Sequence, residues 1–347
     1  MTTSRIFSCF LISLSFLLGS LTHAQMIEIG SQKVKSNQPL GSSVSMVRPA
    51  RRRGEKPPCG YFDPDCRRKI GAILSGIHLL IPDAETGVRF GHGEADAAVR
   101  VGLDVASVDA PAGDLSAIVF EALYLPDAGG FRIRFSLAES QVLFFCRAPE
   151  DPETGKRKWI PPIMSLLSDC EEEGFLGLGG NILEMQGDTG TGRFGARWLE
   201  LNLVLNALNN ANSLAYLQNR LNFFTGFAVD TVWRKDTPGA PSPDAESALR
   251  MNLGMMGMIR TNNNRFEMRA FAAYRPDMTD WSDFAVEAKT ELLYHLLFGE
   301  KKNMLGSVGL STEYSYWSKP ENSIGEFASD RDQHSAYVGA LFRFTFK

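Results

Sequence analysis

The chain has 347 residues, of which 44% are hydrophobic, and its formal net charge at pH 7 is −4. This charge excludes a strongly basic nucleic-acid-binding protein, so we expect no nucleic-acid partner. Composition alone does not separate an exported globular protein from a membrane barrel, and the order of the residues has to decide.

The first 24 residues have the layout of a cleavable secretory signal. Arg5 precedes an apolar run from Ile6 to Leu18, and small residues then lead to Ala24. The apolar run is shorter than the ~20 residues that a spanning helix needs. We therefore expect residues 1–24 to be a signal peptide that is cleaved near Ala24, with an uncleaved anchor helix as the alternative.

Residues 25–58 are expected to form a flexible basic leader. The segment is poor in aromatic residues and rich in Ser, Gly, Pro and basic residues. Such a segment buries too little apolar surface to offset the entropy of ordering. Its cluster RPARRRGEK could attract anionic lipid headgroups, although a solvated run of charge is the simpler interpretation.

Four cysteines follow the signal: Cys59, Cys66, Cys146 and Cys170. An even number of cysteines in an exported chain favours disulfides, and the short spacing CGYFDPDC favours Cys59 with Cys66 among the three connectivities. The paired CxxC pattern of zinc sites is absent, and no His lies close to either pair in the sequence. We expect no metal site and no cofactor.

The region 59–173, which carries these cysteines, is rich in predicted strands. In AAVRVGLDV and GGFRIRFSL apolar residues alternate with Arg, Gly, Asp or Ser, whereas DLSAIVFEALYL and QVLFF are apolar on both faces. The connector 147–173 breaks this rhythm, and we expect one short helix in it near residues 163–168. The predicted strands lie near residues 76–82, 95–106, 115–125 and 131–146. They are either the first strands of a barrel or a separate periplasmic domain.

From residue 174 to residue 347 the pattern is regular. Eight segments alternate between apolar and polar residues, and each has about 10 to 16 residues, the length with which a tilted strand crosses a bilayer. The connectors NNANS, TNNN and GEKKN are short, and those that alternate with them are longer. Short periplasmic turns and longer outer loops are typical of transmembrane barrels.

The two faces of these strands differ in chemistry. One face collects Leu, Phe, Val and Met, as at Leu199, Leu201 and Leu203, and we expect it to contact lipid. The other face is charged, with positive and negative residues balanced, which predicts little charge selectivity. The residues expected to line the lumen, as a channel or as a salt-bridge network, are Glu200, Arg220, Asp230, Arg250, Glu267, Arg269, Arg275, Glu287, Lys289, Glu291, Glu313 and Arg343.

The last strand carries an aromatic pattern, with Tyr337 near its start and Phe342, Phe344 and Phe346 at alternate positions. It resembles the C-terminal recognition strand of bacterial outer-membrane β-barrel proteins, in detail over the final ten residues before Lys347 and in general alternation from Gly174. One departure is that Lys347 follows the last aromatic residue. The resemblance identifies no narrower family.

What the resemblance implies is an outer-membrane location in a Gram-negative bacterium. It also implies contact with outer-membrane lipid, and insertion by the barrel-insertion machinery through the C-terminal strand.

We predict an all-β fold, an antiparallel transmembrane β-barrel of about 12 strands. The alternative is an 8-stranded barrel at residues 174–346 with a β-rich N-terminal periplasmic domain. Twelve strands leave a narrow pathway, whereas eight leave an interior that side chains fill.

The expected function is therefore a passive, porin-like channel for small polar solutes. A non-conducting structural or surface-interaction barrel is the alternative, and a lipid-modifying enzyme is a lesser one. His295 and His334, the latter beside Ser335, are weak catalytic signals, and we assign no catalytic residue. The oligomeric state does not follow from the sequence.

Overall fold

The computed structural model describes residues 76–91, 94–110, 113–125, 130–165, 172–188, 193–209, 217–233, 245–261, 264–298, 304–322, 324 and 333–346. These ranges do not include the predicted signal, the predicted leader, Cys59, Cys66 or Cys170. The described elements are β1 (Gly76–Gly91), β2 (Glu94–Ala110), β3 (Gly113–Leu125), β4 (Gly130–Arg147), β5 (Trp159–Ile160), α3 (Pro162–Ser165), β6 (Glu172–Asn181), β7 (Leu183–Asp188), β8 (Arg193–Asn209), β9 (Leu217–Trp233), β10 (Ala245–Thr261), β11 (Phe266–Pro276), β12 (Phe284–Phe298), β13 (Met304–Trp317), η1 (Pro320–Asn322) and β14 (His334–Phe346).

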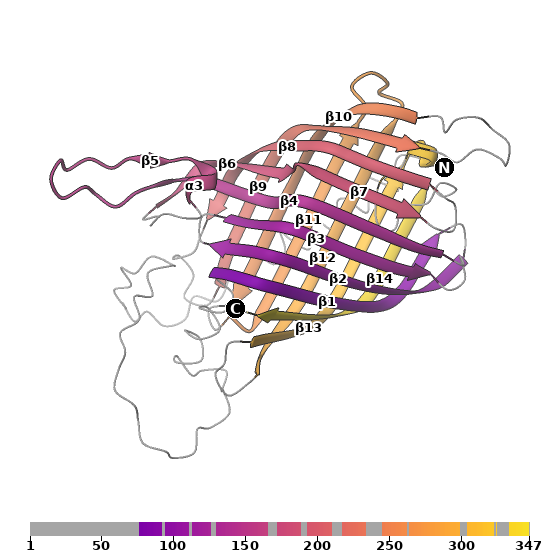
Figure 1. Ribbon diagram of the computed structural model, residues 1–347, viewed down its shortest axis with the longest axis horizontal. Coiled ribbons are helices and arrows are strands. Elements are labelled where there is room, and N and C mark those ends of the chain that lie inside the picture. The colour runs from indigo at the N-terminus through magenta and orange to yellow at the C-terminus, as the bar shows by residue number, and fades with distance from the viewer. Residues whose placement is uncertain are drawn as a thin grey trace, which may run out of the picture. The chain divides into compact units, whose positions relative to one another are not determined.

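The strands close into a ring in which every pairing is antiparallel (Figure 1). Each strand of the ring pairs with its neighbours in the sequence, and β1 pairs with β14 to close it, from Leu80 opposite Phe346 to Gly91 opposite Ser335. β6 and β7 follow one another in a single place between β4 and β8, and β5 pairs only with the end of β4. The ring therefore has twelve strands.

This ring confirms the predicted twelve-stranded antiparallel barrel and excludes the eight-stranded alternative. Strands β1 to β4 belong to the wall, which is the first of the two interpretations of region 59–173. They also extend further than predicted, since β1 runs to Gly91 and not to residue 82. A closed ring leaves no strand edge unpaired, although the register is locally irregular between β3 and β4, between β4 and β6 and between β8 and β9.

The outward face of the ring is apolar. Leu201, Phe227, Leu310 and Phe342 are exposed on it, whereas the residue on either side of each in its strand is buried or only partly exposed. This follows from the strand period of two, which sends alternate side chains to opposite faces. No helix among the described residues has the length and apolar composition needed to cross a bilayer.

The break between β6 and β7 depends on a glycine. Gly180 has a φ of +126°, and a Cβ atom there would lie 2.0 Å from the carbonyl oxygen of Glu200 on β8. Only glycine tolerates both this backbone conformation and this close approach. The strand continues as β7 after Ile182, so the wall stays closed across the irregularity.

The two ends of the ring differ. One end, here called the loop end, carries the connectors between β9 and β10, between β11 and β12 and between β13 and β14. The other, the terminus end, carries the start of β1 and the end of β14. The connector from β4 to β6 leaves the terminus end as a hairpin that continues β4 beyond the wall, with β5 in its second arm and α3 after it (Figure 1). α3 overlaps the short helix predicted near residues 163–168 and starts one residue before it.

Candidate functional site: the charged interior of the barrel

The interior of the ring holds an extended set of ion pairs. Among the twelve predicted lumen residues, six are buried: Glu200, Asp230, Arg250, Glu267, Arg275 and Glu291. The remaining six are partly exposed: Arg220, Arg269, Glu287, Lys289, Glu313 and Arg343. Each of these twelve residues alternates in its strand with apolar residues on the outward face. Their side chains therefore lie on the inner face.

The first group of ion pairs runs from β8 to β11. Arg197 Nε lies 2.8 Å from Asp230 Oδ1, and Arg250 Nε lies 3.4 Å from Asp230 Oδ2. Arg275 on β11 lies 3.2 Å from Glu200 on β8, three strand positions away, so the contact crosses the inside of the ring. These residues share partners and act as one network.

The second group lies on β1 to β4 and was missed by the sequence-based assignment of lumen residues. Arg100 pairs with Glu85 and lies 3.4 Å from Glu121. Arg134 Nη1 lies 2.9 Å from Glu121, and Arg134 Nη2 lies 2.7 Å from Glu139. The signal was available at Arg100 and Arg134, which alternate with apolar residues as in the later strands, whereas Glu121 lies in a segment that is apolar on both faces.

The third group crosses the seam between β1 and β14, the first and last of the described strands. Arg343 on β14 lies 3.3 Å from Glu291 on β12 and 3.6 Å from Asp83 on β1. Lys289 also reaches Glu291, at 3.4 Å. Buried ions need partners, because each unpaired one costs several kcal/mol, and this interior supplies them.

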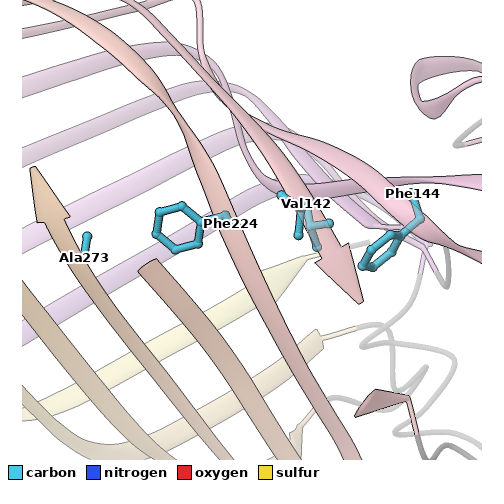
Figure 2. Close-up of a cluster of buried hydrophobic side chains, with 5 residues drawn as sticks. Val142, Phe144, Phe224 and Ala273 are labelled. Atoms are coloured by element: carbon cyan, nitrogen blue, oxygen red, sulfur yellow. The ribbon is translucent and has the colours of Figure 1, made fainter. Parts of the chain in front are cut away.

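Apolar side chains also occupy the interior. Figure 2 shows Phe224 of β9 between Ala273 of β11 and the β4 residues Val142 and Phe144. Phe271 packs on the same cluster, and its ring stacks on Phe224 with centroids 5.6 Å apart. Sequence reasoning missed this inward aromatic cluster because both faces of β4 and β9 carry apolar residues here.

At the loop end, part of the β13–β14 connector folds inward. Ile324 is buried against Val232, Ala285 and Trp317. The Asn322 amide nitrogen donates to Asp283 Oδ2 at 2.9 Å. These contacts occupy part of the opening at that end.

The two histidines that gave weak catalytic signals in the sequence, His295 and His334, lie in different places. His295 Nδ1 lies 2.8 Å from Ser307 Oγ, and its Nε2 lies 3.4 Å from Glu267 Oε2, with all three residues buried. His334 is exposed and its Nδ1 lies 2.8 Å from the Tyr314 hydroxyl. Ser335 is buried and contacts Arg89, so it is not the partner of His334. Within the described ranges, no group of three or more His, Cys, Asp or Glu residues is arranged to hold a metal ion.

The remaining predicted residues concern disulfides and the C-terminal strand. Cys146 is buried at the end of β4 and is disulfide-bonded, whereas the other three cysteines lie outside the described ranges, so the connectivity stays a prediction. Phe342, Phe344 and Phe346 are exposed on the outward face. Tyr337 is buried on the inner face with Ala98, Leu123 and Leu125, and so does not share their surface.

No family model and no curated protein matches the chain. Several solved structures do at low identity. The NanC porin is 14% identical over 77% of this chain and 99% of its own, with a TM-score of 0.35. OmpT, an outer membrane protein of Vibrio cholerae, is 10% identical over 78% of this chain and 100% of its own, with a TM-score of 0.22. The transport unit of the autotransporter AIDA-I from Escherichia coli is 11% identical over 77% of this chain and 90% of its own, with a TM-score of 0.27.

The architecture itself gives the classification. A closed antiparallel ring of twelve strands pairs its backbone between neighbouring strands, and this one has an apolar outer face and a charged inner face, as a membrane requires. The chain therefore has the fold of a transmembrane β-barrel.

Proposed function

We propose that the protein is a passive channel for small polar solutes in a bacterial outer membrane. The observation that carries this proposal is the exposure of charged side chains inside a closed ring, such as Arg269 and Lys289. A twelve-stranded ring is wide enough for a narrow pathway. The apolar outer face fits lipid. We propose that the signal directs export and is then cleaved, and that the insertion machinery recognises the C-terminal strand.

Planar-bilayer recording tests this function. The refolded, signal-free protein is expected to give discrete current steps that grow with salt concentration. Arg269→Ala is expected to change the step size, with Lys158→Ala in the β4–β5 hairpin as a control that leaves it unchanged. A folded, inserted protein that stays silent, or a conductance that Arg269→Ala does not alter, contradicts the channel.

A second candidate is a non-conducting structural or surface-interaction barrel. It is favoured by the packing of Ile324 and Asn322 in the opening at the loop end and by the apolar cluster around Phe224. Under this alternative the interior ion pairs serve stability alone, and the outer loops form the contact surface. We propose no catalytic activity, and hydrolysis of outer-membrane lipid by the refolded protein would contradict that.

A further inference from the structure

The interior charges are balanced in number but unequal in exposure. The side chain of Arg269 is 36% exposed, whereas its partner Glu267 is fully buried. The side chain of Lys289 is 31% exposed, whereas its partner Glu291 is 9% exposed. In both pairs the cationic group is therefore more exposed than its carboxylate partner, although Glu313 of β13, directly opposite Lys289, is also partly exposed.

An aromatic surface adjoins these cations. Phe271 of β11 lies directly opposite Lys289 of β12 in the strand register, and Arg269 is the inward-facing residue two positions before Phe271. The Phe271 ring stacks on Phe224 at an interplanar angle of 12°. Met256 of β10 is the register partner of Phe271 on its other side and packs against the same cluster.

Cations beside a partly exposed ring define a ligand chemistry. A carboxylate accepts charge-assisted hydrogen bonds from ammonium and guanidinium groups. A flat apolar body gains area burial and ring contacts against a phenylalanine. A simple inorganic anion would use only the cations, and a neutral arene would use only the ring.

We propose that Arg269, Lys289 and Phe271 form a binding subsite for small aromatic carboxylates inside the barrel. The carboxylate lies toward Lys289 and Arg269, and the arene lies against Phe271. From the sequence, the balance of positive and negative residues in the lumen predicted little charge selectivity. The subsite refines that prediction, because selectivity depends on which of the charged groups are exposed to water. It deepens the proposed channel by naming the solute class, and it rests on that function only for the route by which the ligand enters.

The test uses 4-fluorobenzoate titrated against the refolded, signal-free protein in detergent and followed by fluorine NMR, which requires no conduction. Lys289→Gln is expected to raise the dissociation constant about 10-fold, because a charge-assisted hydrogen bond is lost while Glu291 keeps Arg343 as its partner. Phe271→Leu is expected to raise it about 3-fold through loss of ring contact. Acetate and fluorobenzene are expected to bind more weakly than 4-fluorobenzoate.

Two matched variants serve as controls. Lys158→Gln removes a lysine from the hairpin outside the ring, and Phe342→Leu shortens an outward-facing phenylalanine, so both are expected to leave the dissociation constant unchanged. Heat-dependent gel mobility checks that each variant is folded. Equal affinity of 4-fluorobenzoate for the original protein, Lys289→Gln and Phe271→Leu would overturn the subsite.

Bilayer recordings on the same preparations separate this inference from the proposed function. A protein that conducts but does not bind 4-fluorobenzoate overturns the subsite and leaves the channel standing. A silent protein that binds 4-fluorobenzoate and loses affinity in Lys289→Gln supports the subsite and overturns the channel.

Discussion

At Glu200, four side chains converge on one carboxylate. Asn202 donates to it at 2.8 Å, Asn252 at 3.1 Å, Arg275 at 3.2 Å and Arg197 at 3.3 Å. The donors come from β8, β10 and β11, so this residue ties together wall segments that are distant in the sequence. Its alternation with apolar neighbours predicted that it faces inward. Its partners could not be predicted, because they depend on the curvature of the closed ring.

Glu200→Ala is expected to destabilise the barrel by about 3–5 kcal/mol, since it leaves buried guanidinium groups without this partner. Glu150→Ala is the matched control, because Glu150 is exposed in the hairpin and its nearest cation, Arg157, is 3.9 Å away. We expect the control to change stability by less than about 1 kcal/mol. Urea unfolding in detergent measures both, and equal effects would contradict the network.

Asp280, outside the membrane-spanning strands, offers a second test at the residue scale. A hydrogen bond from Lys319, followed in importance by those from Ser282, lowers the pKa of the Asp280 carboxyl from 3.8 to about 2. A depressed pKa means that the stabilisation is present above the ordinary value and is lost as pH falls through about 2.

Lys319→Met is expected to raise the pKa of Asp280 toward its ordinary value. Carbon-detected NMR of the carboxyl measures the shift as pH is lowered. Lys158→Met, a lysine change in the hairpin at the other end of the ring, should leave the titration of Asp280 where it is. If Asp280 titrates alike in all three proteins, its low pKa does not come from Lys319.

At the scale of elements, strands and connectors differ in how far the sequence predicts them. The strands predicted from residue 174 onward match β6 to β14. They were predictable because each strand has lipid on one face and polar groups on the other, so apolar and polar residues alternate along it. The inward fold of the β13–β14 connector gave no such signal. Its residues Asn322 and Ile324 are held by Asp283, Glu246 and Trp317, which are distant in the sequence.

Asn322→Ala is expected to loosen this connector and raise the single-channel conductance. The substitution removes hydrogen bonds to Asp283 at 2.9 Å and to Glu246 at 3.3 Å, worth about 1–3 kcal/mol in total since the acceptors are charged. Gln333→Ala is the matched control, because the Gln333 side chain donates to the Ser318 carbonyl on the exposed side. An unchanged conductance in Asn322→Ala would show that the connector does not limit the current.

At the scale of the whole molecule, the barrel is inverted relative to a soluble protein, with apolar side chains outside. Trp198 is 50% exposed on the outward face, whereas Trp317 is 1% exposed on the inner face. In brominated phospholipid, a variant that keeps only Trp198 is expected to lose fluorescence strongly, and one that keeps only Trp317 is expected to lose little. Equal quenching of the two would contradict the assigned faces.

The sequence left the size of the ring between eight and twelve strands. The segments DLSAIVFEALYL of β3 and QVLFF of β4 are apolar on both faces, as in a strand of a soluble core. The count became definite only through the pairings of β3 with β4 and of β1 with β14, which are properties of the assembled ring.

The β1–β14 seam has one further consequence. Gly87 and Gly339 face each other across it, and a Cβ on Gly87 would lie 2.2 Å from the Val338 carbonyl oxygen, so the seam is packed as closely as backbone allows. Because Leu80 and Phe346 are register partners, the start of β1 lies beside the end of β14. The order of strands around the ring therefore does not depend on where the chain is cut. A circular permutant that joins these ends and opens in the connector after Trp233 would keep every strand pairing of the barrel.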